Sequence, residues 1–169
     1  MRIAKSLVIV PLLALGFASA AEAAVDVKFV EPEHYTDPNL RGGYGEKARA
    51  PALREIKTYL ERLGERYLKP NQQLEVEVLD IDLAGRHEPW RAFTYNTRIL
   101  RGITWPSITL RYSLRENGAL LVSAEERVSD LAYLMRQPGR YASQPLPYEK
   151  AMLESWFRNR FERLLPPPA

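Results

Sequence analysis

The sequence contains no cysteine, which excludes disulfide bridges, thiolate metal ligands and a cysteine nucleophile. It has only two histidines, His34 and His87, and no serine lies in a Gly-x-Ser-x-Gly turn. The formal net charge of +3 is too small to indicate a nucleic-acid partner. These shortages argue against nucleophilic catalysis, a disulfide-stabilised fold and nucleic-acid binding.

Long apolar runs are also scarce, and the clearest one lies at the N-terminus. Two cations precede the apolar run Ser6–Phe17, and small residues in Ala-x-Ala patterns follow it, as in a cleaved signal peptide. The run is shorter than the ~20 residues that span a bilayer, and Pro11 interrupts it. We therefore predict a signal peptide over residues 1–24, cleaved near Ala20–Ala24, a periplasmic location and no membrane span afterwards.

The rest of the chain has the length and composition of one globular domain. Apolar residues make up 46% of the sequence and charged residues 27%, which is ordinary for a folded protein. We expect a single domain over residues 25–165, followed by a frayed, proline-rich tail over residues 166–169.

A β-hairpin is the strongest local signal. Asn117-Gly118 joins two alternating runs between Ile108 and Val128, and this dipeptide suits a type I′ turn with positive φ at both central residues. On the first arm, one face carries Ile108, Leu110, Tyr112 and Leu114. A lone hairpin is marginal in water, so other elements must cover it.

Two amphipathic helices are expected to provide this cover. Over residues 50–68 the apolar stripe is Leu53, Ile56, Leu60, Leu63 and Tyr67. Pro51 fits the first turn, whereas Gly64 weakens the stripe. A second helix is predicted over residues 147–165, with Trp156, Phe157 and Phe161 on its core face; an exposed partner-binding patch is the alternative.

Further strands are expected at Val25–Val30 and Leu74–Leu83. The second changes phase at Val78-Leu79, so it contains a bulge or is covered on both faces. We expect loops at 31–46 and 137–147, and one or two helical turns at Leu131–Met135. Residues 85–106 have no clean period. The predicted fold class is α+β, with a small, mostly antiparallel sheet and two amphipathic helices packed on one face.

Several segments together are distinctive. They are Phe29–Glu33, Val78–Gly85 (VLDIDLAG), Glu88–Arg91, Arg98–Arg101, Val128–Asp130 and Tyr148–Phe157 (YEKAMLESWF). In these segments the chain resembles a family of exported proteobacterial proteins known only as a domain of unknown function. The resemblance implies export from a Gram-negative cell and a single domain, but it implies no activity, ligand or catalytic residue.

An arginine and aromatic tract in residues 85–106 is the best candidate for a binding site. Guanidinium groups suit phosphate and carboxylate, while aromatic faces suit sugars or stacked arginine. We predict ligand binding by Trp90, Arg91, Arg98, Arg101 and Trp105, with an envelope protein, an anionic glycan or a lipid head group as partner. The alternative is that the tryptophans are core residues and the arginines solvate the surface.

A metal site is a second candidate. Asp80 and Asp82 lie on one face of a strand, and His87 follows in the next turn, with His34 or Asp37 available from the long loop. A mixed nitrogen and oxygen set suits zinc or manganese, whereas carboxylates alone suit calcium. The competing interpretation is pairing of the carboxylates with arginine.

Paired catalytic carboxylates are the weakest candidate. Glu125 and Glu126 are adjacent and point to opposite faces of a strand, so only Glu125 with Asp80 or Asp82 could flank one bond. We therefore expect a non-enzymatic binding or assembly module without a cofactor. One alternative is a metal-assisted hydrolase acting on envelope material. Another is a purely structural protein whose only contacts are its own copies.

Overall fold

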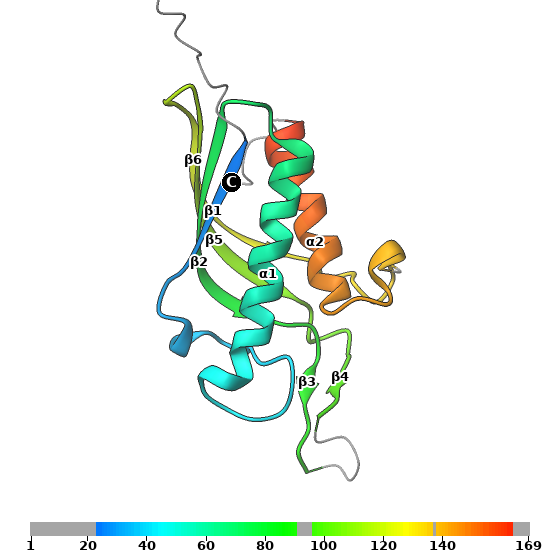
Figure 1. Ribbon diagram of the computed structural model, residues 1–169. Coiled ribbons are helices and arrows are strands. Elements are labelled where there is room, and N and C mark those ends of the chain that lie inside the picture. Colours follow the sequence, from blue (N-terminus) through cyan, green and yellow to red (C-terminus); the bar gives the residue numbers. More distant parts are fainter. Residues whose placement is uncertain (1–22, 91–95, 137, 164–169) are drawn as a thin grey trace, which may run out of the picture.

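A four-stranded sheet with the strand order β1-β2-β5-β6 forms one layer of the protein (Figure 1). The computed structural model describes residues 23–90, 96–136 and 138–163. The strands are β1 (Ala24–Phe29), β2 (Gln72–Asp82), β5 (Ser107–Glu116) and β6 (Ala119–Ser129). β1 runs parallel to β2, and the other two pairs are antiparallel. The predicted α+β class with a mostly antiparallel sheet is confirmed.

The β5–β6 hairpin turns at Asn117-Gly118 as predicted. Both residues have positive φ, 50° and 82°, which is the requirement of the type I′ turn. The first-arm face that was expected to be apolar is buried, from Ile108 to Leu114. The hairpin is therefore one half of the sheet, and its buried face forms part of the core.

The phase change in β2 is a β-bulge. The pairing with β5 shifts register between Val78 and Asp80, so Leu79 is the extra residue. Val78 and Ile81 are both fully buried on either side of the bulge. The bulge thus lets both halves of an irregular sequence pattern contribute to the same core.

Helix α1 (Glu46–Tyr67) begins one turn earlier than predicted. Gly45 occupies the N-cap with φ 83°, and Pro51 lies inside the helix rather than in its first turn. Proline lacks the N–H that would bond to the Lys47 carbonyl, so this interior position is unusual. The predicted helix start near residue 50, with Pro51 in the first turn, was therefore wrong, whereas the buried stripe containing Ile56, Leu60 and Leu63 was correct.

Gly64 has a packing role that the sequence did not predict. A Cβ built on Gly64 would lie only 2.1 Å from Cγ2 of Val25 in β1. The glycine therefore allows α1 to approach β1 closely, and it lies within the buried stripe instead of interrupting it.

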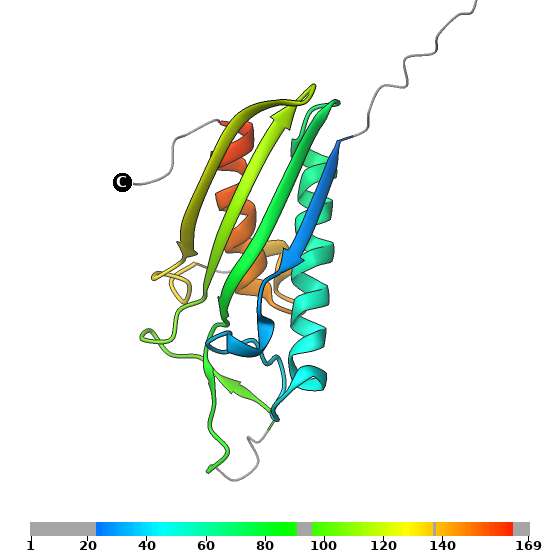
Figure 2. The same cartoon turned by 90° about the vertical axis from the view of Figure 1, so that its left-hand side faces the viewer.

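Helix α2 (Pro147–Phe157) starts at proline as predicted and continues into a short π-helical turn, Arg158–Glu162. The N–H of Arg163 donates to the Arg158 carbonyl at 2.8 Å, a five-residue step. Trp156, Phe157 and Phe161 are buried, so the core interpretation of this aromatic stripe is confirmed. Both helices lie on the same face of the sheet (Figures 1 and 2).

One buried carboxylate joins α2 to the sheet. Glu126 of β6 accepts hydrogen bonds from Tyr112 Oη at 2.8 Å and Trp156 Nε1 at 2.8 Å. Arg160 donates to it through Nε at 2.7 Å and Nη2 at 2.8 Å. Burial alone would raise the pKa of Glu126, but these hydrogen bonds outweigh burial and lower it.

The remaining elements are short. They are a 3-10 turn at Pro32–His34, a second at Gly139–Tyr141, and the two-residue strands β3 (Arg86–His87) and β4 (Arg98–Ile99), which pair with each other. Leu131–Met135 forms consecutive turns rather than regular helix, with the Met135 N–H donating to the Ala132 carbonyl at 2.9 Å. In the described part of the chain, no helix is long and apolar enough to cross a membrane.

Candidate functional site

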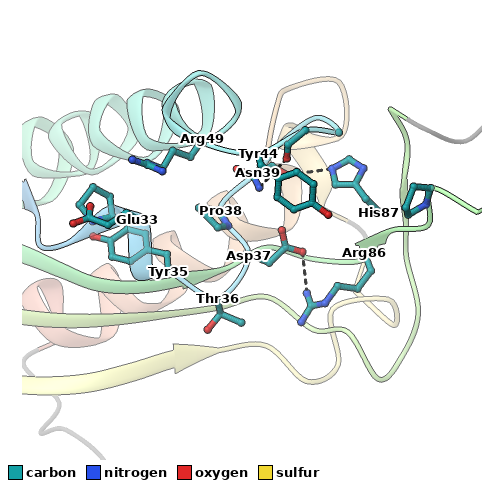
Figure 3. Close-up of a pocket in the computed structure, with 15 residues that line it drawn as sticks. Glu33, Tyr35, Thr36, Asp37, Pro38, Asn39, Tyr44, Arg49, Arg86 and His87 are labelled. Carbon is teal, nitrogen blue, oxygen red and sulfur yellow. Dashed lines mark hydrogen bonds and ion pairs between the residues drawn. The ribbon is translucent and has the colours of Figure 1, made fainter.

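The β3–β4 ribbon and the loop of residues 31–45 meet at the end of the molecule where β1 and β2 stop (Figure 1). We call this region, residues 31–45, 83–90 and 96–104, the ribbon end. It encloses a cleft of about 470 Å³ between the loop, the first turn of α1 and β3. Figure 3 shows Arg86 and His87 at one side of this cleft, and Glu33 and Arg49 at the other.

A charged hydrogen-bond network fixes the loop to the ribbon, with Asp37 and Arg98 at its centre. Arg98 donates to both oxygens of Asp37, at 3.2 and 2.9 Å. It also donates to four backbone carbonyls, those of Asn39, Leu83, Ala84 and Gly85. Only 9% of the Arg98 side chain is exposed. Arg98 therefore has an internal, structural role.

The two aspartates of the predicted metal site have separate partners. Asp82 binds Arg86 in a bidentate pair, with distances of 2.6 and 3.0 Å. Asp80 accepts hydrogen bonds from the backbone N–H of Thr36 at 2.7 Å and from its hydroxyl at 2.9 Å. Arginine pairing thus applies to Asp82, whereas Asp80 holds the loop by a different contact.

The two histidines lie apart from these carboxylate contacts. His87 Nε2 lies 3.2 Å from the Asn39 carbonyl, and its buried Nδ1 has no hydrogen-bond partner in the described residues. His34 lies on the surface, 3.5 Å from Glu31. Within residues 23–90, 96–136 and 138–163, no three histidine or carboxylate side chains form a group suited to a metal ion. A metal at Asp80, Asp82 and His87 stays a prediction.

Glu125 pairs with Arg111 and not with Asp80 or Asp82, the carboxylates considered as its catalytic partners. Arg111 donates to it at 3.1 and 2.9 Å and reaches Glu77 at 2.9 Å on the other side. The sheet register aligns Asp80 with Thr109 and Arg127, one row away from Glu125. The side chains of Glu77, Arg111 and Glu125 thus form a row across the solvated face of the sheet.

The predicted binding residues of the tract occupy different environments. Trp90 is 77% exposed, and Trp105 is half-buried. Arg101 lies 2.5 Å from the buried carboxylate of Glu88, and its side chain is 45% exposed. Arg91 lies outside the described residues. Trp90 and Arg101 are therefore accessible to a ligand, whereas Arg98 is occupied by the protein itself.

Sequence reasoning missed Tyr44 and Arg49. Tyr44 is 94% exposed at the cleft. The Arg49 side chain lines the cleft and makes no hydrogen bond or ion pair to any residue the structure describes. The glycines around Tyr44 indicated a loop, but nothing in the sequence indicated that this loop folds back against the start of α1. The long-range bridge between Asp37 and Asp82 attaches the first part of this loop to the end of β2.

A buried carboxylate also underlies the ribbon end. Glu149, in the first turn of α2, accepts a hydrogen bond from the Ala84 backbone N–H at 2.8 Å. Burial raises the pKa of Glu149, and the Ala84 N–H opposes this shift only in part. Because the Ala84 carbonyl accepts from Arg98, this short backbone segment links α2 to the network of Arg98.

Comparison with known proteins identifies a family without assigning an activity. Neither the search of curated proteins nor that of solved structures produced a match. The family described as "Protein of unknown function (DUF3016)" matches residues 23–159, which include α1, α2 and all the described strands. This chain therefore belongs to the DUF3016 family.

Proposed function

We propose that this protein is an exported, non-enzymatic binding module of the Gram-negative envelope, and that the cleft at the ribbon end holds its ligand. The observation that carries the proposal is the contrast within the cleft. Asp37 and Arg86 line the cleft and are paired, and Arg98 also binds Asp37. In contrast, the Arg49 side chain has no hydrogen bond or ion pair to a described residue, and the Tyr44 ring is exposed.

The chemistry of these available groups favours an anionic saccharide or a similar envelope component. A guanidinium group binds carboxylate or phosphate in a fork, and it needs no rearrangement when it has no internal partner. Tyr44 and Trp90 offer amphipathic rings, which combine apolar contact area with a polar edge. The internal network keeps the loop in place before the ligand arrives, so little ordering is required on binding.

Export is supported by the N-terminal pattern, and the family match begins at residue 23, beside the predicted cleavage region. Cell fractionation and N-terminal sequencing of the purified protein test this part. We expect a periplasmic product that starts between residues 21 and 25. A cytoplasmic protein that retains Met1 contradicts export.

Binding is tested with soluble peptidoglycan fragments and with lipopolysaccharide, titrated against the purified protein by calorimetry. We expect binding by the parent and a loss of about tenfold or more in affinity for Arg49→Ala, since removal of a charge-assisted contact costs about 1.5–3 kcal/mol. Arg54→Ala, which removes an exposed arginine of α1 that does not line the cleft, is the matched control. Equal affinity of the parent and Arg49→Ala contradicts the proposed site.

A metal-assisted hydrolase is the second candidate, favoured by the buried Nδ1 of His87, which has no hydrogen-bond partner among the described residues. Elemental analysis of the purified protein tests it, together with thermal unfolding in the presence of zinc, manganese or calcium. Bound metal, or a rise in melting temperature that His87→Ala removes, supports this candidate. No metal and no shift in melting temperature contradict it.

A further inference from the structure

The β6 edge of the sheet is an unusually long and regular surface for pairing. β6 has 11 residues, compared with six in β1 at the opposite edge. Figure 2 shows β6 as an outermost strand, with the helices behind the sheet and not beside the strand. An exposed edge strand presents free N–H and C=O groups that another strand can bind.

The free groups on this edge can be assigned to particular residues. The Asp130 N–H donates to the Pro106 carbonyl at 3.3 Å, so the backbone at residue 130 points toward β5. The direction alternates along an antiparallel strand, and the register from Ser107 to Leu114 is continuous. The backbone groups of Ser123, Glu125, Arg127 and Ser129 therefore point outward, away from β5.

The side chains on the solvated face of this edge carry complementary charges. Glu125 and Arg127 are both exposed and lie two positions apart. In an antiparallel pair of β6 strands related by a two-fold axis at Glu126, Glu125 of each copy lies opposite Arg127 of the other. Opposite charges directly across a strand pair stabilise it, whereas like charges destabilise it.

The same arrangement extends a charged row that already crosses the sheet. Glu77, Arg111 and Glu125 alternate in sign on three adjacent strands, and the row ends at the edge with an acidic residue. The next strand would continue the alternation with Arg127 of a second copy. A second copy of β6 would therefore continue the alternation of charge along this row.

Glu126, which lies at the two-fold axis, does not oppose this pairing. Glu126 turns toward the helices, where Arg160, Trp156 and Tyr112 bind its carboxylate, and only 7% of its side chain is exposed. On the same inner face, Val122 and Ala124 are only half-buried. A second strand would cover these partly exposed apolar residues and strengthen the association through burial.

We propose that β6 is a homodimer interface, in which two copies pair antiparallel about Glu126 to form one continuous eight-stranded sheet. A second copy is favoured over an unrelated strand because the charge pattern is self-complementary under a two-fold axis. This interface is separate from the cleft, so it does not depend on the proposed ligand.

Light scattering coupled to size-exclusion chromatography tests the proposal with protein produced from the full sequence. We expect a mass twice that of the monomer. The variants Glu125→Arg and Arg127→Glu each place like charges opposite one another at two positions of the interface. We expect each to weaken dimerisation by about tenfold or more. An equimolar mixture of the two variants restores all the opposite-charge pairs and should form a heterodimer.

Controls separate this result from misfolding and from pairing at another surface. Lys28→Glu makes a similar charge change on β1, at the other edge, and should leave the dimer intact. Circular dichroism checks that each variant is folded, and recovery on mixing shows that both remain competent to pair. A monomeric parent, single variants that dimerise as strongly as the parent, or a mixture that stays monomeric overturns the proposal.

Discussion

Leu60 and Arg98 are both largely withdrawn from water, yet different interactions hold the two regions to which they belong. Leu60 is fully buried in α1 among apolar side chains, in a core that extends from β1 to the aromatic residues of α2. Arg98 is held at the ribbon end by a carboxylate and four carbonyl groups. The first region depends on packing and the second on directed hydrogen bonds.

This difference predicts how each region fails. Apolar contacts in the core are numerous and shared, so the loss of one side chain lowers the stability of the whole cooperative unit. Hydrogen bonds at the ribbon end converge on a few groups, so the loss of one group opens a local segment first. The following predictions test this distinction, beginning with the largest expected effect.

The largest effect is expected in the core. Leu60→Ala should lower the free energy of unfolding by about 2–5 kcal/mol, because it removes a fully buried side chain and leaves a cavity. Urea denaturation measures this change, with Leu121→Ala, on an exposed hairpin position, as the control. A change below about 1 kcal/mol in Leu60→Ala would mean that α1 is not part of the cooperative core.

A smaller but local effect is expected at the ribbon end. Arg98→Ala should cost about 1.5–3 kcal/mol, the range for hydrogen bonds to charged groups. Hydrogen exchange should accelerate in residues 37–39 and 83–87 well before the core strands are affected. Arg41→Ala, an exposed loop change, is the control. Uniform acceleration across the sheet would contradict the separation of the two regions.

Gly64→Ala tests how closely the core is packed. Alanine normally stabilises a helix interior relative to glycine by about 0.8–1 kcal/mol. Here the added Cβ meets Cγ2 of Val25, so we expect destabilisation by about 1–3 kcal/mol instead. In the Val25→Ala background the cost of Gly64→Ala should largely disappear. A stabilising effect in the parent background would show that β1 and α1 separate easily.

Two buried carboxylates should give opposite dependences of stability on pH. The pKa of Glu126 is lowered in the folded state, so its stabilising contribution is present above its unfolded pKa and is lost as pH falls through the folded pKa. The pKa of Glu149 is raised, so its contribution is present below its unfolded pKa and is lost as pH rises through the folded pKa.

Glutamine variants separate these two contributions. Glu126→Gln should flatten the loss of stability at acidic pH, whereas Glu149→Gln should remove the loss as pH rises above the ordinary range of a carboxyl group. Urea unfolding at a series of pH values measures both slopes. The assignment is contradicted if Glu149→Gln leaves the pH dependence unchanged while the variant remains folded.

The smallest effect is expected at the exposed surface of the ribbon end. Tyr44→Ala and Trp90→Ala remove exposed rings, so each should change the free energy of unfolding by less than about 0.5 kcal/mol. Chemical denaturation provides the measurement. A larger loss would mean that these rings support the fold and would weaken their proposed role toward a ligand.

The sequence was most informative where structure depends on near neighbours. The Asn117-Gly118 turn, the bulge beside Val78 and the apolar stripe of α1 follow from residue spacing and from positive φ. Local signals were less reliable at the ends of elements. Pro51 suits a first turn, yet α1 begins at Glu46 and continues through Pro51, whose missing N–H removes one backbone hydrogen bond.

The candidate site was predicted only in part, because its contacts join distant residues. The tract containing Arg98 was identified, but no sequence pattern distinguishes a ligand-binding arginine from one paired with Asp37 across the fold. The same limit applies to Asp80, whose partner is Thr36. No sequence pattern marked Tyr44 or Arg49, because their positions at the cleft depend on the path of the loop of residues 31–45.

The parallel pairing of β1 with β2 has a consequence for the order in which the chain folds. Val27 pairs with Val76, and α1 lies between the two strands in sequence, whereas the β5–β6 hairpin closes around a two-residue turn. Local pairings form faster than those that close a long loop. We therefore expect β1, which is synthesised before β2, to join the sheet only after β2 has been made. Until then its apolar residues, Val25, Val27 and Phe29, have no strand partner and are exposed to solvent.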